Sequence, residues 1–275
     1  MLEDNFMYVI RKALRGLELA PNEAAERAGL DGAAVQGLLA GRWDEPAARL
    51  LAPAIGLDVA ALAAHPDYEP PNCDHPAIQR LDLPFGEDEQ VNAWLLGTGQ
   101  GKLLIDAGCD DASLMATLER ASAVGEIRDV IITHNHRDHV GGLGILRGRD
   151  VSVYGPVGAG GEWNELRPGN SLRCGDLEIT VHDLAGHADP AIGLWIGGLG
   201  QPVLVVGDAL FAGSIGGCAG KAAYQMAHRT LRAALDGLPG TTILLPGHGP
   251  ATLMDAEWKS NPFLAGDGAG FCGAE

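Results

Sequence analysis

The spacing of apolar residues differs on the two sides of residue 66. Over residues 1–65 apolar side chains recur every three or four positions, as at Phe6, Val9, Ile10 and Leu14. This spacing predicts short amphipathic helices, and no strand signal interrupts them. The expected helices cover residues 6–14, 22–28, 33–40, 46–55 and 59–64.

Beyond residue 76 the apolar residues gather into short runs rich in Val, Ile and Leu, which predict strands. The expected strands are 78–83, 91–96, 102–105, 130–133, 151–154, 177–182, 192–196, 203–206 and 243–245, with helices at 112–122 and 225–235. These runs form two β-rich halves, each flanked by a helix. We therefore expect an α/β protein with an αββα sandwich rather than a doubly wound sheet.

Three segments follow from this pattern. A small all-α domain over residues 1–65 precedes a linker at 66–76, which contains four prolines. Residues 77–275 form the expected catalytic domain, ending in a Gly-rich tail that we expect to be peripheral or disordered. His65 and His75 flank the linker and are expected to face solvent.

Composition narrows the classes of function. The 275 residues are 46% hydrophobic, enough for a sizeable core, and the net charge of −17 disfavours nucleic acids and anionic membranes as partners. No apolar stretch approaches 18 residues, and no signal peptide is visible at the start. The odd number of cysteines, five, favours reduced thiols and a cytoplasmic location.

The densest cluster of reactive side chains is at residues 134–139, which read His-Asn-His-Arg-Asp-His. Three of the nine histidines and one carboxylate fall within six positions, directly after an apolar run. At a strand end His134 and His136 would project to the same side, and Asp138 and His139 would lie on the turn beyond. Imidazole and carboxylate ligands suit zinc, iron or manganese, so the cluster predicts a metal site.

Four other positions share one setting, a His or Asp that follows an apolar run and has a glycine one or two residues away. They are Asp106, His187, Asp208 and His248. Each is ambiguous alone, since a single His after a strand is usually structural. The repeated setting predicts that they gather where the sites of α/β proteins lie, at the carboxyl ends of strands.

The order of these residues resembles the metallo-β-lactamase superfamily, whose signature is His-x-His-x-Asp-His, then a distant His, an Asp and a last His. The resemblance covers roughly residues 78–265. Within the superfamily the chain is most similar to the glyoxalase II (hydroxyacylglutathione hydrolase) branch. That similarity rests on Gly-Asp-Ala-Leu-Phe at 207–211, Gly-Ser-Ile-Gly at 213–216 and Pro-Gly-His-Gly-Pro at 246–250.

The resemblance implies a site for two divalent ions, with zinc favoured and iron or manganese as alternatives. The implied ligands, with Asp208 bridging, are His134, His136 and His187 for the first ion and Asp138, His139 and His248 for the second. Asp106 matches an aspartate that supports the ligands from behind. Two such ions roughly 3.5–4 Å apart generate hydroxide at neutral pH, and Asp138 is the carboxylate best placed to orient it or accept its proton.

The positions that would select the substrate differ from those of the glutathione-specific members. Glutathione-specific members place a lysine and a tyrosine just after the aspartate motif, where this chain has Gly217 and Ala219. Lys221 and Tyr224 follow a few residues later and could either bind substrate instead or lie on an ordinary surface helix. The expected activity is therefore hydrolysis of a thioester or related small acyl compound, with the thiol carrier open.

The first domain resembles a helix-turn-helix of the phage-repressor type over residues 24–42. Its presumed recognition helix offers only Gln36 to a base edge, and residues 1–68 hold six Lys and Arg against ten Asp and Glu. Phosphate neutralisation supplies most DNA affinity, so DNA is not an expected partner. The domain could instead pack on the catalytic domain, cover its mouth or mediate homodimer formation.

Two alternatives to the hydrolase stay open. One is a mononuclear iron persulfide dioxygenase, a branch that shares the fold, with iron held by His134, His136, His187 and Asp208. The other is a metal- or metabolite-responsive regulator that uses the helical domain on DNA, against which the acidic charge argues.

Overall fold

Two six-stranded sheets form the centre of the molecule. The computed structural model describes residues 1–86, 89–123 and 126–265. The first sheet consists, in spatial order, of β1 (Ile78–Phe85), β2 (Glu89–Gly97), β3 (Lys102–Ile105), β4 (Ile127–Ile131), β5 (Ser152–Pro156) and β6 (Asn164–Leu166). The second consists of β14 (Thr252–Leu253), β13 (Ile243–Pro246), β10 (Val203–Gly207), β9 (Ile192–Gly197), β8 (Leu177–Asp183) and β7 (Ser171–Cys174).

The central strands are apolar on both faces because both faces are covered. In β10, Val203 and Val205 point into the core between the two sheets, whereas Leu204 and Val206 point to the helical side. Alternate side chains of a strand face opposite ways, so a strand buried on both faces reads as a continuous apolar run.

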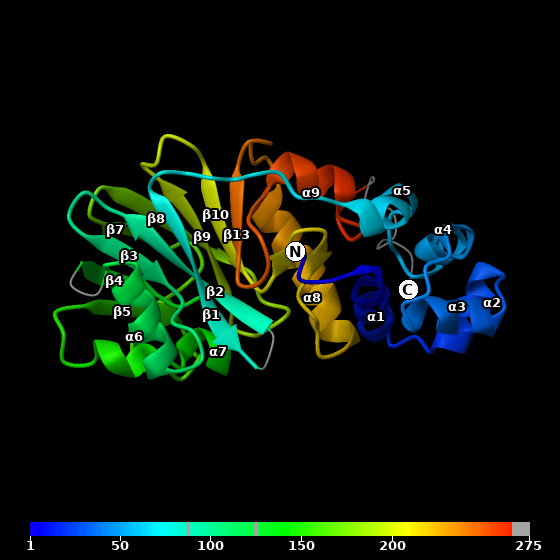
Figure 1. Ribbon diagram of the computed structural model, residues 1–275, viewed down its shortest axis with the longest axis horizontal. Helices are drawn as coiled ribbons and strands as arrows, with labels where there is room; N and C mark the ends of the chain where they lie inside the picture. The colour runs from blue at the N-terminus through cyan, green and yellow to red at the C-terminus, as the bar shows by residue number, and fades with distance from the viewer. Residues whose placement is uncertain (87–88, 124–125, 266–275) are drawn as a thin grey trace.

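Helices cover the outer face of each sheet (Figure 1). On the first sheet, α6 (Asp111–Arg120) packs its Leu114 and Leu118 into a cluster with residues of β1 to β4. On the second, α8 (Lys221–Leu235) contacts β8, and its Leu231 and Leu235 join an apolar cluster that includes Leu204 of β10 and Leu244 of β13. The expected αββα sandwich is confirmed.

The remaining elements are short and lie near strand ends. They are α7 (Arg137–Val140), the 3-10 turn η2 (Leu143–Leu146), the hairpin of β11 (Leu210–Phe211) and β12 (Ser214–Ile215), and α9 (Met254–Ser260).

The N-terminal region is entirely helical, as predicted. Its helices are α1 (Phe6–Leu17), α2 (Pro21–Ala28), α3 (Gly32–Leu39), α4 (Glu45–Ala54) and α5 (Val59–Ala64), followed by the turn η1 (His65–Asp67). Asn and Asp side chains cap four of these helices by accepting backbone N–H bonds; the caps are Asn5, Asp31, Asp44 and Asp58. The helix predicted from Asn22 instead starts at Pro21, whose fixed φ suits the first helical position.

These five helices lie beyond α8, with α1 beside it (Figure 1). Together with their flanking residues as far as His65, they form the helical module. A single apolar cluster runs from the module through α8 to the second sheet, and it includes Ile10, Leu62 and Leu204. The approach of α1 to α8 is closest at Gly16, where an added Cβ would lie 2.3 Å from Cγ of Tyr224. Only a glycine lets the two helices meet this closely.

The structure departs from the sequence prediction at His65, beside the linker. His65 does not face solvent: it is 1% exposed, and its Nε2 hydrogen bonds the carbonyl of Gly213 at 3.0 Å. This prediction was wrong because the helical module folds back onto the second half of the chain, which local sequence does not reveal. The Gly-rich tail beyond residue 265 lies outside the described residues.

None of the helices within the described residues is long and apolar enough to cross a membrane.

Substituting Gly16 tests the contact between α1 and α8. Gly16→Ala should lower the free energy of unfolding, since overpacking costs about 1–3 kcal/mol and exceeds the ~0.5–1 kcal/mol that Ala gains over Gly in a helix. The matched control is Gly37→Ala in α3, where the new Cβ would sit 3.6 Å from Arg42 Nη2, an ordinary contact. Urea unfolding should give Gly37→Ala a higher free energy of unfolding than Gly16→Ala. The reverse order would contradict the close packing of α1 on α8.

Candidate metal centre

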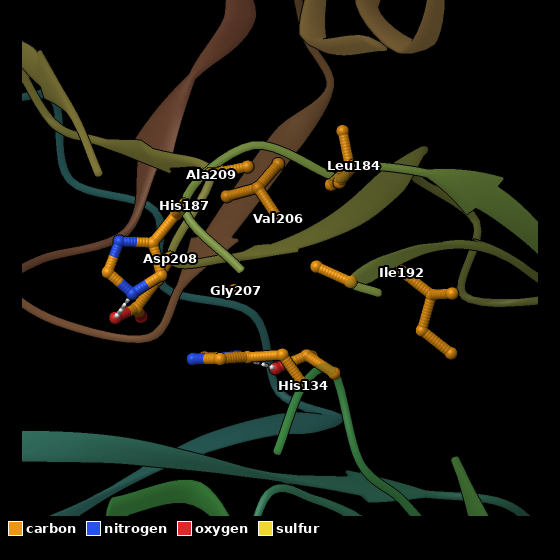
Figure 2. A pocket seen from close by; sticks show the side chains of 10 residues that line it. His134, Leu184, His187, Ile192, Val206, Gly207, Asp208 and Ala209 are labelled. Carbon is orange, nitrogen blue, oxygen red and sulfur yellow. Dashed lines mark hydrogen bonds and ion pairs between the residues drawn. The ribbon is translucent and has the colours of Figure 1, made fainter. Parts of the chain in front are cut away.

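Three imidazole rings converge to form a first group of ligand atoms. His134 Nε2 lies 3.0 Å from His136 Nδ1, and His187 Nε2 lies 3.1 Å from the same atom. All three nitrogens lie within 4.8 Å of one another. Figure 2 shows the rings of His134 and His187 on opposite sides of a narrow gap, with Asp208 beside them.

A second group lies next to the first and consists of two carboxylates and two imidazoles. His248 Nε2 is 3.3 Å from Asp138 Oδ2, and His139 Nε2 is 3.4 Å from Asp208 Oδ1. Asp208 joins the two groups, because its Oδ2 lies 3.5 Å from His187 Nε2 and also 3.5 Å from His248 Nε2.

The local chain differs from the strand expected for the hexapeptide. β4 ends at Ile131, so His134 and His136 lie on an irregular segment beyond it, held by an isolated bridge between His134 and Ala191. Asp138 and His139 lie on the single turn of α7. The rings of His134 and His136 still converge, although the alternation of a strand is not what aims them.

The other ligands follow strands of the second sheet, as their sequence setting predicts. Asp208 comes directly after β10, and His248 comes two residues after β13. These two strands are neighbours and run parallel, so their carboxyl ends meet. Gly247 permits the contact, because a Cβ there would lie 2.1 Å from Asp208 Oδ1.

Each of four histidines is oriented by a partner on its second ring nitrogen. His187 Nδ1 donates to the carbonyl of Gly217 at 2.8 Å, and His248 Nδ1 donates to that of Gln90 at 2.9 Å. A carbonyl can only accept, so in the neutral ring the proton is on Nδ1 and the lone pair of Nε2 faces the site. His139 Nδ1 donates to Asp106 at 2.8 Å, with the same result.

Asp106 anchors the first sheet's side of the site. Its carboxylate accepts the Thr133 N–H at 2.8 Å and the Thr133 hydroxyl at 2.9 Å, besides the bond from His139. Since the Thr133 hydroxyl donates to Asp106, its oxygen can accept from His134 Nδ1, 3.1 Å away. Sequence reasoning identified Asp106 but missed Thr133, although it directly precedes the first ligand.

Burial and charge give the two groups different affinities for protons. Burial by itself lowers the pKa of His139, but Asp208 and Asp106 outweigh it and raise that pKa well above its usual value. The pKa of His248 is raised as well, because the bond with Asp138 and the charge of Asp208 outweigh burial. In the first group, burial lowers the pKa of His134 to about 2 and also lowers that of His187.

The carboxylates of the second group stay ionised. Burial raises the pKa of Asp208, but the nearby positive charge of His139 outweighs it, and the pKa is lowered. The pKa of Asp138 is lowered in the same way, against burial, by its bond to His248 and by His139. Anionic oxygens among imidazole lone pairs form a donor set suited to divalent cations.

Two buried atoms of the second group indicate a missing partner. Among the described residues, His139 Nε2 and Asp208 Oδ1 make no hydrogen bond, although both are buried. Buried polar atoms are nearly always satisfied. A metal ion between these two atoms would satisfy both, so the residues present fit the implied ions.

The two weakly supported substrate residues lie elsewhere. Tyr224 is 1% exposed and packs beneath Gly16 of α1, so it does not present a ring to substrate. Lys221 begins α8, where its backbone N–H donates to Glu18 of the helical module. Neither residue lines the narrow pocket at His134, His187 and Asp208. Tyr224 is buried because α1 covers this part of α8, a contact that no local pattern in the sequence predicts.

The chain belongs to the metallo-beta-lactamase superfamily, whose family model matches residues 86–248. The matched segment contains both ligand groups in full.

A curated relative supports the likeness to glyoxalase II, and two solved structures resemble this chain in fold. A hydroxyacylglutathione hydrolase of Yersinia pestis is 30% identical over 140 residues, which are 50% of this chain and 53% of the relative. The chain thus matches about half the length of such curated relatives. The crystal structure of ETHE1 from Myxococcus xanthus superposes with a TM-score of 0.58 at 27% identity, over 70% of this chain and 88% of the other. The protein TTHA1623, solved in a di-iron-bound form, gives a TM-score of 0.52 at 27% identity, over 66% of this chain and 99% of the other.

Asp106→Asn tests the support of the ligands. An amide cannot hold His139 Nδ1–H and the Thr133 donors as an anion does, so we expect metal affinity to fall about 10–100-fold. Competition with a chromophoric chelator measures this, with Asp82→Asn on the exposed part of β1 as the control. Equal affinities for the two variants would mean that Asp106 does not position the ligands.

Acidification should release metal from the second group first. A raised pKa keeps His139 and His248 protonated up to higher pH, so protons compete with a metal ion there earlier as pH falls. The lowered pKa values of His134 and His187 delay this competition in the first group. Two variants separate the groups: His248→Ala keeps the first group complete, and His134→Ala keeps the second. The metal content of each is measured after dialysis at a series of pH values from 8 down to 5. The His134→Ala protein, left with the second group, should lose its ion at the higher pH.

Proposed function

We propose that the protein is a metal-dependent hydrolase that cleaves a thioester or a related small acyl compound at a pair of divalent ions. The observation that carries this proposal is the shared carboxylate of Asp208, equally distant from His187 of one group and His248 of the other. Membership of the superfamily and the similarity to a hydroxyacylglutathione hydrolase support it.

The seven candidate ligands fall into two sets, one for each ion. His134, His136 and His187 would hold one ion and Asp138, His139 and His248 the other, with Asp208 between them. When bound, the two ions supply a water of lowered pKa and polarise the substrate carbonyl. Zinc is the proposed metal, and the di-iron form of TTHA1623 keeps iron as the alternative.

Asp138 is the proposed catalytic carboxylate. Its pKa is lowered, so it is ionised at neutral pH, and its Oδ2 is engaged with His248 and lies 3.6 Å from His139 Nε2. Its other oxygen is then available to orient the attacking water and to accept its proton.

Two aromatic rings pack against His248 on this side of the site. The centroids of Phe85 and Phe211 lie 5.5 and 5.8 Å from that of His248. Apolar walls with few polar groups are typical of small-molecule sites, so a small molecule is the proposed substrate. DNA is not proposed as a partner, since the helical region carries excess acidic charge.

The decisive experiment combines metal analysis with a substrate panel. Protein purified without added ions should contain close to two divalent ions per chain and hydrolyse one or more thioesters better than lactones or phosphodiesters. Asp138→Asn should lower kcat by about 10²–10⁴-fold, and Asp150→Asn on an exposed loop should not change it.

A different outcome would replace the proposal. One iron per chain, with oxygen consumption on glutathione persulfide, would indicate the persulfide dioxygenase alternative. The complete second group, with His248 held by Gln90, argues for two ions.

A further inference from the structure

Residues 210–217, called the bracing segment here, touch ligands of both groups from the outer side. The segment comprises the β11–β12 hairpin and two glycines. The ring of Phe211 meets that of His248 nearly edge-on, with an interplanar angle of 84°. The carbonyl of Gly217 accepts the proton that orients His187.

Gly216 brings the bracing segment against the shared carboxylate residue. A Cβ on Gly216 would lie 1.8 Å from the carbonyl oxygen of Asp208 and 3.0 Å from Cβ of His187. The backbone therefore contacts both residues with no side chain between them. A small shift of this segment would move His187, Asp208 and His248 together.

The helical module holds the bracing segment from the far side. Lys12 of α1 donates to the carbonyl of Ile215 at 2.8 Å, and its ammonium lies 4.7 Å above the ring of Phe211. The lysine stem approaches Gly217 as well, since a Cβ there would lie 3.9 Å from Cε. One side chain thus reaches both ends of the segment.

The ammonium of Lys12 is itself fixed in place. Its side chain is 17% exposed, and it forms an ion pair with Asp4, whose side chain is 6% exposed. An ammonium has three donors, and two are directed at Asp4 and Ile215. Such a buried, paired cation resists displacement, because breaking the pair would leave a charge uncompensated.

His65 adds a second contact from the module. Its Nε2–H donates to the carbonyl of Gly213 at the tip of the hairpin. On the other side of the same residue, the Gly213 N–H donates to the buried carboxylate of Glu257 at 3.0 Å. Contacts from the module therefore fall at the start, tip and end of the bracing segment.

We propose that the helical module helps to fix the geometry of the metal centre, and that Lys12 is the residue through which it positions the ligands. Lys12 acts through Phe211 on His248 and through the glycines 216 and 217 on His187 and Asp208. It is a positioning residue, and the proposal rests on the metal site of the proposed function. An aliphatic side chain at position 12 would leave the Ile215 carbonyl without its donor and the Phe211 ring without its cation.

Metal affinity of the full chain tests this directly. Lys12→Met keeps much of the side-chain length but removes charge and donor, and should weaken Co²⁺ binding about tenfold, the lower end for groups that orient metal ligands. The visible absorption of bound Co²⁺ should change too, because it reports ligand geometry. Lys12→Arg restores charge and donors and should recover most of the affinity.

The matched control lies one residue away on the same helix. Arg11 donates to the Leu39 carbonyl inside the helical module, so Arg11→Met should leave Co²⁺ affinity and spectrum unchanged. If Lys12→Met matches Arg11→Met in both, the inference is overturned, even where its melting temperature falls. Should Lys12→Met fail to fold, Asp4→Asn serves instead, since it keeps the lysine but frees it from its counter-ion. A smaller loss of affinity and a shifted spectrum are expected there, and wild-type values would overturn the inference.

The two proposals fail in different ways. A wild-type protein that binds no divalent ion would remove the proposed function. A wild-type protein that binds two ions, with a Lys12→Met variant that binds them equally well, would remove only the role of the helical module.

Discussion

The burial of one carboxylate, that of Asp208, constrains the whole centre of this protein. An ionised group 6% exposed costs several kcal/mol unless positive charge or donors surround it. Here the surroundings are imidazoles from three separate chain segments, those of His139, His187 and His248. Bringing them to one point requires the carboxyl ends of β10 and β13 to meet the first sheet's turn α7. Gly247 lets the backbone approach the carboxylate, and Gly216 lets it approach the main-chain carbonyl of the same residue.

The side chains around this carboxylate are held by hydrogen bonds from neighbouring residues, and those residues are held by further contacts. Asp106 and Thr133 fix the ligands on the first sheet, and backbone carbonyls of Gln90 and Gly217 fix His248 and His187 on the other side. The carbonyl of Gly217 belongs to a segment with little regular structure of its own. Such a segment needs external contacts to hold one conformation, and α1 provides them through Lys12. The αββα sandwich and the helical module also share one apolar cluster.

Much of the fold could be predicted from sequence because its strands are buried on one or both faces. Continuous apolar runs such as that of β10 identify central strands. The edge strands β6, β7 and β14 and the hairpin β11–β12 escaped prediction, since they are two to four residues long and lack the longer apolar run of a strand such as β3. So short a segment carries almost no periodicity, and its pairing depends on neighbours distant in the chain.

For the site, local sequence determined the chemistry, and tertiary structure determined the geometry. The spacing of residues 134–139 forces three imidazoles and a carboxylate into one neighbourhood whatever the rest of the chain does. That His187, Asp208 and His248 complete two groups could be inferred only by resemblance, because nothing local links positions so far apart. The burial of Tyr224 and His65, and the reach of Lys12 to Ile215 across 203 positions, followed no pattern in the sequence. Contacts of this kind come from the packing of whole elements, here α1 against α8, and packing is decided by shape and volume rather than by spacing along the chain.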